Sequence, residues 1–132
     1  MTPEDWKPLL DLIAVIEETE TFTEPRTVSY TDDNILSYSP ATEAPVIYTF
    51  FEVVYKIPII IDFGWAQWDE GRVLADHPDT DFDSIETPKK CKLITAFVRN
   101  DRFCDGALAS RFEDGSILRI LKSICNQVNP GV

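Results

Sequence analysis

The stretch that decides the fold is residues 88–128, PKKCKLITAFVRNDRFCDGALASRFEDGSILRILKSICNQV. Its apolar residues recur every three or four positions, which is the spacing of one face of an α-helix. They fall into three groups: Leu93 to Val98, Cys104 to Phe112, and Ile117 to Val128. Gly115 can end the second helix and Ser116 can cap the third. This stretch therefore predicts three consecutive helices, the first from about residue 88 to residue 99.

Two further helices are predicted upstream. Apolar residues at helical spacing run from Trp6 to Ile16, behind a Thr-Pro pair that suits a cap and first turn, so residues 3–18 are predicted to be helical. Residues 46–55 carry a similar stripe that ends before Pro58. Their β-branched content leaves a strand as the alternative for this second segment.

The remaining segments predict little regular structure. Residues 27–31 alternate in a way that suits a short strand, and residues 59–61 suit a short buried extended run. Residues 62–72 and the acidic residues 75–86 are predicted to be loops. As a whole, the sequence predicts a mostly α fold. We expect a compact single-domain helical bundle of about five helices over residues 1–132, with a short extended segment in the middle.

Charge is divided unevenly along the chain. Residues 1–86 carry 19 acidic and 4 basic side chains, whereas residues 87–132 carry 4 acidic and 8 basic ones, within an overall charge of −11. The favoured interpretation is that the two parts neutralise each other in the fold. The alternative is that a basic helical surface meets an anionic partner, or that an acidic surface repels or mimics nucleic acid.

Several classes of protein are excluded by composition. The first five residues lack the positive and apolar regions of a secretory signal. The most apolar window, residues 44–61, contains Glu52, Lys56 and two prolines, so we expect no membrane span. Three cysteines without CxxC spacing indicate reduced thiols. We therefore expect a cytoplasmic protein.

No catalytic or metal-binding constellation is evident. His77 is the single histidine, which excludes multi-histidine metal sites, and the acidic loop beside it lacks the glycine and glutamate of a calcium-binding loop. Cys104 lies on the apolar face of its predicted helix, which favours a structural thiol. We assign no catalytic residue, no metal and no cofactor, and the sequence leans toward a protein that is not an enzyme.

The turn from Arg99 to Gly106 joins two of the predicted helices. In a structural interpretation, Asn100 forms a left-handed helix end, Asp101 caps the next helix, Phe103 fills the corner and Gly106 allows close helix approach.

A functional interpretation makes the same turn a small anion site. Arg99 and Arg102 would hold a phosphate or carboxylate near a helix N-terminus, with Asp101 and Asp105 beside them.

Trp65 and Trp68 are a second candidate feature. Two indoles three residues apart can share one face of a helical turn. Such a pair most often closes a core, and the alternative is a platform on which a ligand stacks.

The segment Leu93 to Leu121, with its Arg-Asn-Asp-Arg-Phe-Cys-Asp-Gly run at residues 99–106, resembles the C-terminal signature of a prokaryotic family catalogued only as a domain of unknown function. Similar proteins place Phe-Asp-Trp before a second tryptophan, whereas this chain reads Phe-Gly-Trp at residues 63–65. The resemblance implies a single cytoplasmic domain without assigning an activity. It also implies that Arg99, Arg102, Phe103 and Gly106 matter to fold or function.

These observations predict a non-enzymatic interaction domain that binds a protein, a second copy or an anionic partner through its C-terminal helices. The alternative is a small enzyme or a ligand-binding pocket that places Trp65 and Trp68 near Arg99 and Arg102. A weaker alternative is nucleic-acid binding by the last three helices, against which the acidic first two-thirds of the chain and the absence of a dense basic stripe count.

Overall fold

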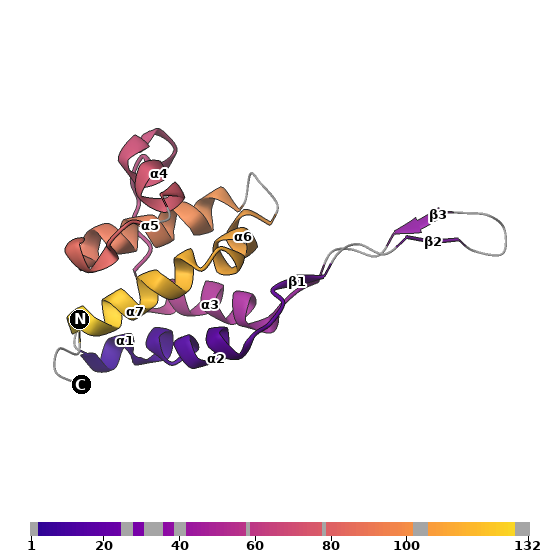
Figure 1. Cartoon of the computed structure of the whole chain (residues 1–132), viewed down its shortest axis with the longest axis horizontal. Helices are drawn as coiled ribbons and strands as arrows, with labels where there is room; N and C mark the ends of the chain where they lie inside the picture. The colour runs from indigo at the N-terminus through magenta and orange to yellow at the C-terminus, as the bar shows by residue number, and fades with distance from the viewer. Residues whose placement is uncertain are drawn as a thin grey trace.

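The structure is a computed structural model, and it describes residues 3–24, 28–30, 36–38, 42–57, 59–77, 79–101 and 106–128. Its α-helices are α1 (Pro3–Leu10), α2 (Leu12–Glu18), α3 (Pro45–Lys56), α4 (Asp69–Asp76), α5 (Thr87–Asn100), α6 (Ala107–Glu113) and α7 (Ser116–Val128). Short 3-10 helices are η1 (Trp65–Gln67) and η2 (Phe82–Ser84), and the strands are β1 (Thr23–Glu24), β2 (Val28–Tyr30), β3 (Leu36–Tyr38) and β4 (Thr42–Glu43). The predicted mostly α fold is confirmed (Figure 1). Within the described residues, no helix is both long and apolar enough to cross a membrane.

The predicted helix over residues 3–18 is divided into α1 and α2. The break falls at Asp11, whose backbone N–H still donates to the carbonyl of Lys7 at 2.8 Å. Pro8 lies inside α1 and has no N–H, so α1 lacks one bond of its hydrogen-bond ladder. The predicted helical segment over residues 3–18 is confirmed, with one interruption at Asp11, which keeps right-handed helical dihedral angles of −62° and −21°.

Residues 46–55 form the helix α3, so the alternative of a strand is excluded. Pro45 stands at the first position of α3, where its fixed φ favours a helix start. Residues 59–61 belong to no helix or strand in the described part of the chain, and Ile59 is buried. Instead, the backbone N–H of Ile61 donates to Oγ1 of Thr95 on α5 at 3.0 Å. Helix α4 was also missed, because residues 62–72 and 75–86 were predicted to be loops.

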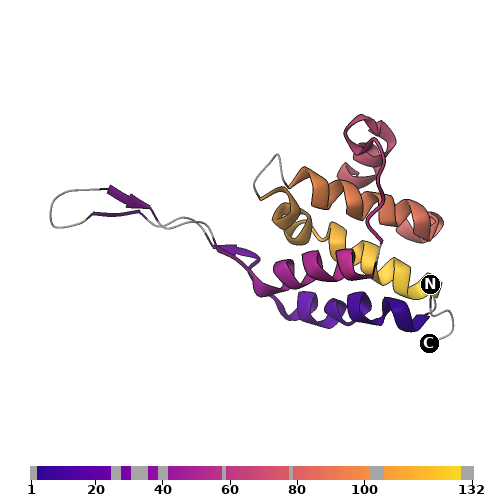
Figure 2. The same cartoon turned by 180° about the vertical axis from the view of Figure 1, so that it is seen from behind.

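Helix α7 lies at the centre of the fold, in contact with α1, α2, α5 and α6. Its residues Ile117, Ile120, Leu121 and Ile124 are all fully buried. Helix α5 packs on α7, and α4 lies on the side of α5 away from α7 (Figures 1 and 2). The three C-terminal helices predicted from the sequence are therefore largely core elements.

Gly115 joins α6 to α7 with a φ of +83°, as the sequence predicts for a helix end. Ser116 is the first residue of α7, and its backbone N–H donates to Oδ1 of Asp114 at 2.8 Å. The predicted capping by the Ser116 hydroxyl was wrong, because the preceding aspartate supplies the acceptor.

A two-stranded arm extends away from the helices (Figures 1 and 2). It consists of two antiparallel ladders, β1 with β4 and β2 with β3. In the outer ladder Val28 is opposite Tyr38 and Tyr30 is opposite Leu36. The expected strand near residues 27–31 is therefore present as β2, and it pairs with β3, which begins eight residues after β2 begins.

Ion pairs join the acidic and basic parts of the sequence. Lys89 on α5 pairs with Glu70 on α4 at 2.6 Å. Lys122 on α7 pairs with Glu17 on α2 at 2.9 Å. These contacts support the interpretation that the two parts neutralise each other in the fold.

Candidate functional site

Trp65 and Trp68 lie in the segment between α3 and α5, and both are partly buried. The ring of Trp68 meets the ring of Phe63 edge to face, with centroids 5.5 Å apart. Its indole also lies over α4 at Gly71, where an added Cβ would come within 2.3 Å of Cε3 of Trp68. The missing side chain of Gly71 therefore determines where Trp68 packs.

A cavity of about 290 Å³ lies between this segment and helices α5 and α6. Its volume is close to the lower limit of small-molecule sites, about 300 Å³. The apolar part of its lining is Trp65, Ala66, Trp68, Ala75, Leu93, Ala96 and Phe97. The polar part is Arg72, Asp76, Asn100 and Arg111. The cavity thus combines aromatic walls with two guanidinium groups and one carboxylate.

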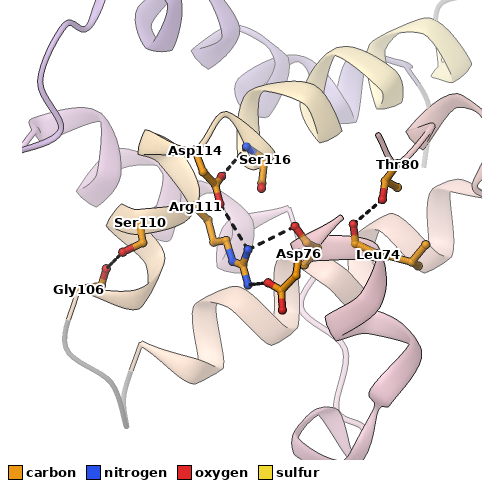
Figure 3. Close-up of polar contacts among 9 residues, drawn as sticks. Leu74, Asp76, Thr80, Gly106, Ser110, Arg111, Asp114 and Ser116 are labelled. Carbon is orange, nitrogen blue, oxygen red and sulfur yellow. Dashed lines mark hydrogen bonds and ion pairs between the residues drawn. The ribbon is translucent and has the colours of Figure 1, made fainter. Parts of the chain in front are cut away.

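Arg111 on α6 is the more enclosed member of its ion pair with Asp76. Its side chain is 26% exposed, compared with 66% for Asp76. Its Nη2 lies 2.8 Å from Oδ1 of Asp76, and its Nη1 donates to the carbonyl of Ala75 at 3.4 Å (Figure 3). The same Nη1 lies 3.4 Å from Oδ2 of Asp114. The guanidinium stands over the ring of Phe97 at 5.0 Å. Through these contacts Arg111 links the C-terminal end of α4 to α6 beside the cavity.

Arg72 is the second cation of the lining. It is exposed, and its Nη2 donates to the carbonyl of Ala66 at 3.3 Å. With Arg72, Arg111 and Asp76, the charged groups of the lining sum to one net positive charge. Two guanidinium groups beside aromatic walls are suited to a flat anion.

The structure describes two members of the predicted anion site, Arg99 and Asp101, whereas Arg102 and Asp105 lie outside the described residues, as do Phe103 and Cys104. Arg99 is partly exposed on the last turn of α5 and does not line the described cavity. The anion site at this turn stays a prediction.

The capping role of Asp101 is confirmed, because its Oδ1 accepts the backbone N–H of Leu108 at 3.1 Å. The left-handed helix end predicted at Asn100 was wrong: Asn100 is the last residue of α5, and the next residue, Asp101, has a right-handed φ of −61°. Gly106 has a φ of +85°, and no described atom lies within 4 Å of where its Cβ would be. Gly106 is therefore required by the backbone turn, and the predicted close helix approach was wrong.

A second polar cluster is buried between α5, α7 and η2. The ammonium of Lys90, which is fully buried, donates to Oγ of Ser123 at 2.6 Å. The hydroxyl of Ser123 in turn donates to Oδ1 of Asp83 at 2.8 Å. A single hydroxyl thus links a buried cation to a surface carboxylate.

Burial changes the proton affinity of two neighbours in this cluster. Desolvation lowers the pKa of Lys90, and the charge of Asp83 opposes that change. Desolvation raises the pKa of the Cys91 thiol from 9.0 to about 11, against the lowering effect of the Lys90 charge. Both effects favour the neutral form of a buried group.

No group of three or more metal-ligating side chains occurs in the part of the chain that the structure describes. Sequence reasoning missed Arg111 and Lys90. Arg111 directly precedes a core phenylalanine on a short helix, so its spacing does not distinguish it from a surface residue. Lys90 lies three and four residues before Leu93 and Ile94, so helical spacing places it on the apolar face of α5, where a lysine is unusual.

A model of a family of unknown function (DUF6508) matches residues 1–130, so the chain belongs to this family. No curated protein and no solved structure matches the chain. The predicted resemblance to a family of unknown function is thereby confirmed, and the predicted origin of that family in prokaryotes stays a prediction.

Proposed function

We propose that this chain is a ligand-binding domain, and that its ligand is a small molecule with a flat unsaturated ring and an anionic group. The observation that carries the proposal is the cavity of about 290 Å³, in which two indoles and the guanidinium of Arg111 line one space. The proposal follows the pocket alternative from the sequence, with Arg111 in place of Arg99 and Arg102.

Aromatic walls favour a flat ring. Trp65, Trp68 and Phe97 all line the cavity, and an aromatic pair contributes roughly 0.5–1.5 kcal/mol beyond the area that it buries. Gly71 holds Trp68 close to α4, so the indole needs little reorganisation before a ring binds.

The guanidinium of Arg111 favours an anion. Three hydrogen bonds from Nη1 and Nη2 to described residues leave donors available on a group that has five N–H bonds. Because Arg111 is only 26% exposed, its attraction for an anion is screened less than that of a surface arginine.

Isothermal titration calorimetry with four matched probes tests this function. We expect 2-naphthoate and 2-naphthyl phosphate to bind. Cyclohexanecarboxylate, which lacks a flat aromatic ring, and 2-naphthol, which lacks the anion, should bind about tenfold more weakly. Equal binding of all four probes, or no binding of any, would remove the proposal.

A second candidate, protein docking, is favoured by the arm rather than by the C-terminal helices. In the described residues, each ladder of the arm has only two strands, so each strand keeps one backbone edge open. Two-stranded ladders are marginal alone, and open edges are templates for further strands. A second copy of the chain can supply such strands.

Sedimentation equilibrium tests this second candidate. The comparison is between the full chain and a variant in which residues 25–41 are replaced by a short Gly-Ser linker. We expect the full chain to dimerise and the variant to remain a folded monomer, which circular dichroism would verify. A full chain that is monomeric at every accessible concentration would contradict docking between copies.

A further inference from the structure

We propose that Asp76 is an internal substitute for the carboxylate of the ligand, and that an aromatic carboxylate exchanges with Asp76 on Arg111 when it binds. This inference rests on the proposed ligand-binding function. It adds the class of anion and names the contact that the ligand must displace.

The geometry places Asp76 where a ligand carboxylate would lie. Oδ1 of Asp76 is 2.8 Å from Nη2 of Arg111, a typical charge-assisted contact (Figure 3). Both side chains line the cavity. A carboxylate that approached through the cavity would meet the same nitrogen.

Asp76 can leave this position easily. Its side chain is 66% exposed, compared with 26% for Arg111, so a released Asp76 carboxylate is solvated at once. The enclosed guanidinium of Arg111, in contrast, needs an anionic partner both before and after the ligand binds. The two side chains of the pair are thus unequal, one fixed and one replaceable.

The position of Asp76 in its helix supports a role other than helix stability. Asp76 is the last residue of α4, where the partial negative charge of the helix dipole disfavours an acidic side chain. Arg111 offsets this disadvantage through the carboxylate of Asp76 and the carbonyl of Ala75.

Asp114 provides a matched control. It also pairs with Arg111, but it does not line the described cavity, and its other oxygen accepts the backbone N–H of Ser116 at 2.8 Å. Asp114 therefore holds the guanidinium in place while Asp76 exchanges. Removing either carboxylate deletes one negative charge near Arg111, but only the removal of Asp76 frees the ligand position.

Calorimetric titration of 2-naphthoate into the wild-type chain, Asp76→Asn and Asp114→Asn tests the exchange. We expect Asp76→Asn to bind about three- to fivefold more tightly, because the lost competitor is a partly exposed ion pair. Asp114→Asn should stay close to wild type. Asp76→Ser serves as a second variant, and thermal melts verify that each protein is folded.

The outcomes separate the inference from the function on which it rests. If wild type binds 2-naphthoate but Asp76→Asn binds no more tightly, the exchange is wrong and ligand binding stands. Equal tightening in Asp114→Asn would also overturn the exchange, because charge removal alone would explain it. Tighter binding of 2-naphthyl phosphate than of 2-naphthoate would overturn the assignment of a carboxylate. If no variant binds either probe, the proposed function fails as well.

Discussion

Gly71 lies directly beneath the indole of Trp68: a Cβ at residue 71 would be 2.3 Å from Cε3 and 2.7 Å from Cζ3 of that ring. No L-residue other than glycine fits there unless the indole moves. Since Trp68 lines the cavity, one missing side chain on α4 sets the shape of the proposed ligand site.

Gly71→Ala should therefore weaken both the fold and the site. Overpacking typically costs about 1–3 kcal/mol, which exceeds the gain of roughly 1 kcal/mol that alanine brings to a helix interior. We expect a lower midpoint in urea and weaker binding of 2-naphthoate. Gly64→Ala is the matched control, because its Cβ would meet only the flexible end of Gln67 at 3.3 Å. Equal effects of the two substitutions would refute this role of Gly71.

The capping contact of Asp101 makes a second prediction. Asp101→Ala removes the acceptor for the backbone N–H of Leu108 and should destabilise the fold by about 0.5–2 kcal/mol. Asp101→Asn keeps a side-chain oxygen and should restore most of the loss. Urea denaturation measures both variants. If asparagine is as destabilising as alanine, the effect does not come from the cap.

A third prediction concerns the buried cluster around Lys90. Ser123→Ala leaves the buried ammonium without the hydroxyl that it contacts at 2.6 Å, at a cost of about 1–3 kcal/mol. Lys90→Met removes the charge together with its need for a partner, so we expect a smaller loss. A double-mutant cycle in urea should show that the two substitutions are not additive. Additive effects would mean that the contact contributes little.

The pH dependence of stability follows from Cys91. Its thiol has a pKa of about 11 in the fold against 9.0 in the unfolded chain. The unfolded chain therefore binds fewer protons at Cys91 between these values, and the contribution of Cys91 to stability falls as pH rises from 9 to 11. The shift corresponds to a loss on the order of 2 kcal/mol over that window.

Two controls accompany this fourth prediction. Cys91→Ala should flatten the decline in the free energy of unfolding between pH 9 and 11. The lowered pKa of Lys90 acts in the opposite direction, because stability from that group rises with pH up to its unfolded value of 10.5. If the free energy of unfolding of the alanine variant falls as steeply with pH as that of wild type, Cys91 is not responsible.

Periodicity predicts the elements that bury one continuous face. Helices α3, α5 and α7 were foreseen because their apolar residues lie on one stripe, such as Leu93, Ile94 and Phe97 on α5. Helix α4 was missed because it is short and its apolar side is small: Gly71 is buried, and Leu74 and Ala75 are only partly buried against the core. The arm was missed because the partner of a strand depends on contacts outside the local sequence.

The sequence predicts the candidate site only in part, because some of its contacts depend on the fold and not on a local pattern. Trp65 and Trp68 were recognised from their residue type and spacing. Arg111, which lines the cavity beside them, was not predicted, because it reaches the cavity only through the packing of α6 on α5. The distance between α4 and α6 is set by the fold, and no local pattern encodes it.

The measurement that tests ligand binding most directly is a nitrogen–proton correlation spectrum of the three tryptophan indoles during titration with 2-naphthoate. Trp65 and Trp68 line the cavity, whereas Trp6 is buried in the core on α1. Single Trp→Phe variants assign the three signals. We predict that the Trp65 and Trp68 signals shift along one common binding curve while the Trp6 signal stays in place. Unchanged signals, or equal shifts of all three, would contradict a ligand site in this cavity.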